Sequence, residues 1–123
     1  MERSMGVVRA LYDAMGRGDA EAAFALLSED LVFELGGNSR FAGRHVGRDK
    51  LFALQGELAQ LTGMETSVDA MYDGDGRAIV HQHGRARDGY IDEALLLFEV
   101  ADGRITAIKE FLFDQRSFDA LVG

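Results

Sequence analysis

The sequence predicts a single α+β domain, residues 1–123, in which helices come first and a sheet follows. Two observations lead to this fold class. Up to about residue 61, apolar residues recur at steps of three and four, which is the helical period. After residue 63 the apolar period becomes two, and the strand-like segments are joined by Asp-Gly sequences that favour hairpin turns.

The first half of the chain predicts three helices. The first ends at Gly16 and Gly18, and its apolar stripe consists of Met5, Val8, Leu11, Tyr12 and Met15. Asp19 is a favourable N-cap for a short second helix, whose inward side holds Ala22, Ala23, Leu26 and Leu27. A third helix near residues 48–61 brings into register Leu51, Leu54, Leu58 and Leu61.

One strand is expected at residues 31–35, and four more follow the third helix. These four form an antiparallel meander: residues 64–72, 77–87, 90–100 and 104–113. The last two strands are apolar on both faces, and one of these faces consists of Leu95, Leu97, Phe111 and Phe113. A half-exposed antiparallel sheet normally alternates apolar and polar residues. We therefore expect a second copy of the chain to cover the outer face, in a homodimer.

Composition narrows the class of partner. The net charge is −8, whereas nucleic acids and anionic membranes select basic surfaces, so we expect neither as a partner. The chain has no cysteine, which excludes a disulfide framework and thiolate chemistry. No apolar run approaches the ~20 residues of a membrane span. These features favour a soluble, cytoplasmic protein.

A row of polar side chains interrupts the strand segment Ile79–Arg87, which reads IVHQHGRAR. Side chains two apart on a strand point the same way, so the row contains His81, His83, Arg85 and Arg87. Three interpretations are open: a solvated outer face, a metal site, or the floor of a chemical pocket. A shift of one residue in register separates an inward row from an outward one.

Several short motifs, taken in order, resemble a known family. YDAMGRGDAEAAFALLSEDLVFEL is followed by FAGRHVGRDKL and later by LLFEVADGRITAIKEFLFD. Their order and spacing are similar to the SnoaL-like, ketosteroid-isomerase-like branch of the nuclear transport factor 2-like superfamily. The resemblance implies a cystatin-like α+β barrel, in which a cone-shaped, curved antiparallel sheet wraps around three N-terminal helices and an apolar pocket opens at one end. Family members often dimerise through the convex sheet face.

The catalytic residues of the ketosteroid isomerases are absent from the matching positions of this chain, so the resemblance does not imply their mechanism. That mechanism uses a tyrosine in the first helix and two aspartates on strands. The matching positions here are Leu11, Leu35 and Leu96, so all three catalytic groups are replaced. Tyr12 lies one residue from the tyrosine position, a rotation of about 100° around a helix, and does not clearly replace it.

Resemblance to another group of the superfamily indicates a candidate catalytic residue on the last expected strand. The final aspartate of the limonene-epoxide hydrolases matches Glu110, while their first-strand tyrosine and asparagine match Phe33 and Leu35. The resemblance also implies that the row on the middle strand faces the pocket. The catalytic residues that we expect are therefore His81, His83, Glu110 and Arg85. The expected substrate contacts are Tyr12, Phe33, Leu35, Leu96, Phe98, Ile108 and Leu112.

These residue types suit acid–base chemistry. A histidine with a pKa of ~6.5 and a desolvated glutamate with a raised pKa make a proton donor and acceptor near neutral pH. An arginine beside them would hold a negatively charged substrate oxygen. The alternatives are structural: Glu110 as an ion pair with Arg85, Tyr12 as a core residue, and His45 and Asp114 as ordinary loop and strand-end residues.

A metal is a further alternative, because two histidines and a carboxylate suit Zn, Fe or Mn. The superfamily is mostly metal-free, so we expect no metal and no cofactor. The function that we expect is acid–base catalysis on an apolar, oxygenated ring compound, of the isomerase, polyketide-cyclase, dehydratase or epoxide-hydrolase type. The alternative is a non-catalytic, dimeric ligand-binding module of the same fold.

Overall fold

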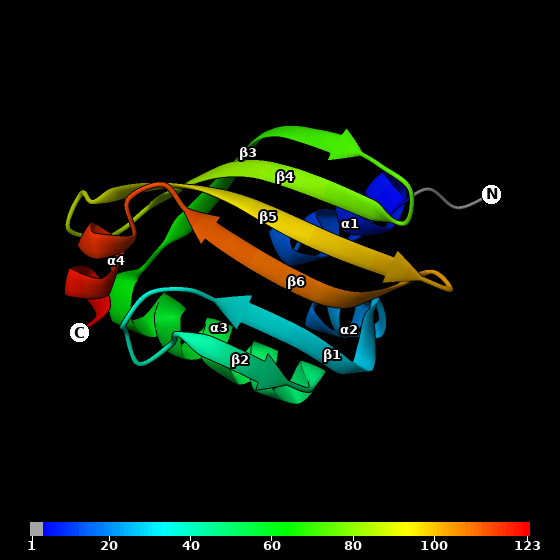
Figure 1. The fold of residues 1–123 in the computed structure, drawn as a ribbon, viewed down its shortest axis with the longest axis horizontal. Helices are drawn as coiled ribbons and strands as arrows, with labels where there is room; N and C mark the ends of the chain where they lie inside the picture. The colour runs from blue at the N-terminus through cyan, green and yellow to red at the C-terminus, as the bar shows by residue number, and fades with distance from the viewer. Residues whose placement is uncertain (1–3) are drawn as a thin grey trace.

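The computed structural model describes residues 4–123, which form one six-stranded sheet and four helices (Figure 1). In chain order the elements are α1 (Ser4–Gly16), α2 (Ala20–Ala25), β1 (Leu27–Leu35), β2 (Gly43–Val46), α3 (Arg48–Thr62), β3 (Glu65–Asp73), β4 (Arg77–Arg85), β5 (Ile91–Ala101), β6 (Arg104–Leu112) and α4 (Gln115–Val122). The strand order across the sheet is β2-β1-β6-β5-β4-β3. The predicted α+β fold with a curved sheet packed on helices is confirmed.

The meander predicted for the second half is also confirmed. Strands β3, β4, β5 and β6 pair antiparallel in succession, and β1 joins them by pairing parallel to β6. Helices α1, α2 and α3 lie on the far side of the sheet in Figure 1, whereas α4 lies at one end of it. We call the face that packs on the helices the concave face and the opposite one the convex face.

Alternation along the strands decides which side chains enter the core. On β5, Ala94, Leu96 and Phe98 are buried, while Leu95 between them is 46% exposed. The same rule on β6 buries Ile108 and leaves Phe111 56% exposed. The concave face and the helices therefore enclose a single apolar core.

Two elements were not predicted. Strand β2 has only four residues and lies between Gly43 and Gly47, both at a φ of 107°, so its apolar pattern is too short to detect. Helix α4 begins at the N-cap Asp114, whose carboxylate accepts hydrogen bonds from the Ser117 backbone N–H and hydroxyl. Phe118 on this helix is buried. An aspartate three residues before a serine was the signal for this helix start.

The predicted apolar stripes are wrong at their ends. Met15 is 53% exposed and Leu61 is 43% exposed, because each lies in the last turn of its helix. Gly63 follows α3 in the left-handed conformation, at a φ of 65°, and its N–H bonds to the Ala59 carbonyl.

Among the helices of residues 4–123, not one has the length and apolar character needed to cross a membrane.

Candidate functional site

The polar row on β4 faces away from the core. Val80 pairs with Leu96 on β5, and both are buried on the concave face. His81 pairs with the exposed Leu95, and His83 pairs with the exposed Glu93. The prediction that His81 and His83 point into an interior pocket is therefore wrong. The two side chains lie on the opposite face of β4, as if the predicted register were shifted by one residue.

Arg85 shares this outward direction. It pairs with Ile91, which is 52% exposed, and its own side chain is exposed. The predicted convergence of Arg85 with Glu110 is therefore wrong, because alternate residues of β4 serve opposite faces. The small and apolar residues Ala78 and Val80 occupy the concave positions and so fix the register.

Gln82 is the polar residue that β4 does place inside. Its Oε1 accepts a hydrogen bond of 2.7 Å from the Tyr12 hydroxyl on α1. Burial raises the pKa of Tyr12, and the negative charge of Glu110 raises it further, so the hydroxyl stays protonated. Tyr12 also makes an edge contact with the ring of Phe98, with centroids 6.1 Å apart. Helix α1 thus holds this hydroxyl at the concave face.

Glu110 occupies the concave face as predicted. On β6 it pairs with Leu96 on one side and with Leu35 on the other. Desolvation raises the pKa of its carboxyl from 4.5 to about 7, and the Asp92 carboxylate adds to the rise. Among residues 4–123, the Glu110 carboxyl has no hydrogen bond or ion pair, including none to Arg85. It is an uncompensated acid among apolar neighbours.

Asp92 completes a group that we call the interior polar group: Tyr12, Gln82, Asp92 and Glu110. Asp92 lies over Gly84, where a Cβ would come within 2.6 Å of its Oδ1. Desolvation raises its pKa, while the Gly84 backbone N–H and the charge of His83 act in the opposite direction. Asp92 and Gln82 were missed because single polar residues in apolar strands gave no motif.

A tyrosine near this group also lacks a partner. The Tyr90 hydroxyl is buried and has no hydrogen-bond partner in the described part of the chain. Burial and then the charges of Asp92 and Asp114 raise its pKa. Buried hydroxyls are normally hydrogen-bonded, so this end of the concave face offers an unused donor beside two carboxyls.

The expected substrate contacts divide into two sets. Five of them are buried in the apolar core and are at most 8% exposed: Phe33, Leu35, Leu96, Phe98 and Ile108. Tyr12 and Leu112 keep partial exposure and pack against that core. All four members of the interior polar group are also partly exposed, so solvent reaches the concave face there. A hollow of about 410 Å³ lies where β1 and β6 end and β2 begins, and Glu110 and Leu112 line it.

The remaining polar residues have structural contacts. His45 lies on β2, where it hydrogen-bonds to the Phe41 carbonyl at 2.9 Å and stacks on Phe33. Asp114 caps α4, and its hydrogen bonds to Ser117 lower its pKa. These positions agree with the ordinary roles expected for them.

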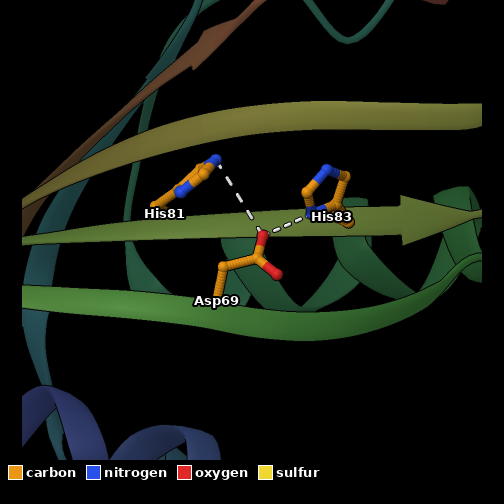
Figure 2. Close-up of side chains that lie close together, drawn as sticks. All are labelled: Asp69, His81 and His83. Atoms are coloured by element: carbon orange, nitrogen blue, oxygen red, sulfur yellow. Dashed lines mark hydrogen bonds and ion pairs between the residues drawn. The ribbon is translucent and has the colours of Figure 1, made fainter.

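A second polar cluster lies on the convex face. Asp69 on β3 and His81 and His83 on β4 (Figure 2), together with Glu93 on β5, form what we call the convex histidine cluster. The nitrogen and carboxylate atoms of the first three residues lie within 4.8 Å of one another. The cluster is separated from the interior polar group by the sheet itself.

The chain resembles several solved structures over most of its length. Bal32a, from a soil-derived mobile gene cassette, is 27% identical with a TM-score of 0.89, and the match covers 98% of this chain and 96% of that one. TerC, co-crystallised with polyporic acid, is 16% identical with a TM-score of 0.81 and 97% coverage of both chains. A putative ketosteroid isomerase from Kribbella flavida DSM 17836 is 22% identical with a TM-score of 0.71, covering 86% of this chain and 74% of that one.

The comparison of sequences agrees with that of structures. No curated protein matches the chain in sequence. The model of the SnoaL-like domain matches residues 8–108, which include all six strands except the end of the last. The chain therefore belongs to the SnoaL-like domain family.

Proposed function

We propose that the chain is an enzyme that moves a proton on an apolar, oxygenated ring compound, with Glu110 as the acid–base group. The observation that carries this proposal is the Glu110 carboxyl, which lies on the concave face without a hydrogen-bond or ion-pair partner among residues 4–123 and whose pKa desolvation raises to about 7. A general base works best when its pKa lies near the working pH. The reaction types that this group suits are isomerisation, cyclisation, dehydration and epoxide opening.

The isolation of Glu110 favours chemistry over a structural role. A structural carboxylate inside a protein is normally paired, because an unpaired buried charge is strongly destabilising. The charge that acts on Glu110 is the like charge of Asp92, and Glu110 in turn acts on the protonated Tyr12 hydroxyl. Residues that are costly to stability and perturbed in pKa are concentrated at functional sites.

The other members of the interior polar group would handle the substrate oxygen. The Tyr12 hydroxyl is a protonated donor that now bonds to Gln82 Oε1 at 2.7 Å. By turning to a substrate carbonyl, phenol or epoxide oxygen, it would stabilise the negative charge that develops when Glu110 removes a proton. Asp92 keeps the pKa of Glu110 high. This scheme uses no cofactor.

An apolar substrate fits the surroundings of these groups. Leu96, Phe98 and Ile108 form the floor beneath them, and Leu112 lies at the partly exposed margin. We propose that the substrate ring packs on this margin, with its oxygen toward Tyr12. A protein of the same fold, TerC, was co-crystallised with polyporic acid. The ketosteroid isomerase scheme is not proposed, because Leu11, Leu35 and Leu96 replace its catalytic groups.

We also propose a homodimer through the convex face. This face exposes Leu95, Phe111 and Phe113 to 46%, 56% and 86%, with Leu97 partly exposed among them. A groove of about 450 Å³ lies between these side chains, Tyr72 and His81. Contiguous apolar surface of this kind is uncommon on monomers. A second copy of the same face would cover it symmetrically.

Glu110→Gln should abolish proton exchange while ligand binding survives. Apolar ring ketones and phenols would be screened by NMR, and each hit incubated in deuterated buffer to follow exchange of its carbon-bound protons. We expect a rate that rises with pH up to about 7, as Glu110 loses its proton, and that falls by ~10²–10⁴ in Glu110→Gln. The control Glu99→Gln, on the convex side of β5, should exchange normally. Hits that bind the unchanged protein without any exchange would instead support the ligand-binding module.

The same substitution should leave stability unchanged or raise it above pH 7. The folded state holds the Glu110 proton up to about pH 7 and the unfolded state only to about 4.5, so Glu110 makes stability fall as pH rises between these values. The loss is at most roughly 3.5 kcal/mol, at about 1.4 kcal/mol for each pH unit between 4.5 and about 7. Urea unfolding at pH 5 and pH 8 would measure it. A Glu110→Gln variant that is less stable than the unchanged protein at pH 8 would contradict the isolated acid.

Phe111→Asp should convert the proposed dimer into a monomer. The substitution places a charge in the middle of the apolar convex face, where a second copy could not desolvate it. Sedimentation velocity at micromolar concentration would give the mass of each species. Leu61→Asp, at a 43% exposed position on α3, is the control and should remain dimeric. A monomeric unchanged protein would refute the interface.

A further inference from the structure

Three neighbouring strands bring four metal-ligating side chains together on the convex face. His81 and His83 lie two residues apart on β4, with ring centroids 5.7 Å apart. Asp69 reaches them from β3, and Glu93 reaches them from β5. From this arrangement we propose that the convex histidine cluster binds one divalent transition-metal ion, with Zn²⁺ as the representative ligand.

The donor atoms already point at a common centre. The Asp69 carboxylate lies against His83 Nδ1, and its Oδ2 is 3.9 Å from His81 Nε2 (Figure 2). The ligand atoms of these three residues are all within 4.8 Å of one another. Two ligands at ~2.1 Å from a tetrahedral ion lie roughly 3.4 Å apart, so small rotations of exposed side chains would accommodate the ion. It would take the place of the hydrogen bond between His83 and Asp69.

A distortion of β3 positions the carboxylate. Val68 pairs with Gln82 and Ala70 with His81, so Asp69 is the extra residue of a β-bulge. A bulge re-aims a side chain that a regular strand would direct elsewhere. Here it turns the Asp69 carboxylate toward the two imidazoles on the adjacent strand (Figure 2). The bulge, the two histidines and the acid therefore act as one local arrangement.

Glu93 supplies a fourth donor from the opposite side. Its Oε2 lies 2.6 Å from His81 Nε2. Asp69, His81 and His83, whose ligand atoms lie within 4.8 Å of one another, fill three positions of a four-coordinate zinc ion, and the Glu93 carboxylate would complete the set by a rotation of its exposed side chain. This mixed set also disfavours Mg²⁺ and Ca²⁺, which prefer oxygen ligands alone. The sequence analysis expected no metal anywhere in the chain, so the proposed ion departs from that expectation; it lies on the other face of the sheet from Glu110.

Zinc titration of the metal-free protein tests the proposal. Isothermal titration calorimetry with ZnCl₂, after chelator treatment and dialysis, should show one saturable site per chain, whereas MgCl₂ should give none. His81→Gln, His83→Gln and Asp69→Asn should each weaken the zinc affinity by about 10- to 100-fold or more. Glu93→Gln should have a smaller effect, because Glu93 contacts only His81.

The chain offers a matched control. His45 is its third histidine and lies on β2, bonded to Phe41, so His45→Gln should bind zinc like the unchanged protein. Sedimentation of each variant would separate loss of a ligand from loss of the proposed dimer, since His81 borders the apolar groove. Absence of a saturable zinc site would overturn the proposal. Zinc binding that persists in a His81→Gln/His83→Gln double variant, or disappears in His45→Gln, would overturn it equally.

Discussion

The register of strand β4 is the constraint on which both candidate sites depend. Ala78 and Val80 must enter the core, so the period of two sends Gln82 inward and turns His81 and His83 outward. One residue of slip would bury the imidazoles beside Glu110 and expose Val80. Because apolar burial sets the register, the chain has two polar groups on opposite faces of one sheet instead of one mixed site.

The interior polar group follows from this separation. Among residues 4–123 no imidazole or guanidinium forms an ion pair with Glu110, and its position on the concave face, between the sheet and the helices, desolvates the carboxyl. Desolvation then favours the neutral acid, whose pKa moves toward neutrality. The helix stripe of α1 brings the Tyr12 hydroxyl to the same region, where Gln82 holds it. The desolvation that gives Glu110 its raised pKa therefore lowers the stability of the folded chain and at the same time suits the residue to its proposed acid–base role.

The fold could be predicted from the sequence much further than the site could. Helical and strand periods, Asp-Gly turns and the motif order led to the SnoaL-like α+β fold because each reports local chain geometry or a long joint pattern. Helix α4 and β2 were missed because they are short. Glu110 was placed on the correct face because the family resemblance matched it to a pocket residue of the last strand. His81 and His83 were placed wrongly because IVHQHGRAR fits either register, and only pairing with β5 distinguishes them.

The central claim is that the interior keeps the Glu110 carboxyl protonated until near-neutral pH. NMR titration of the side-chain carboxyl carbons, with Glu110 assigned by its absence in Glu110→Gln, measures that pKa directly. We expect a value of about 7, well above the 4.5 of an ordinary glutamate. A Glu110 carboxyl that titrates near 4.5 would show that water or a counter-charge reaches it, and would contradict both its isolation and its proposed role as the acid–base group.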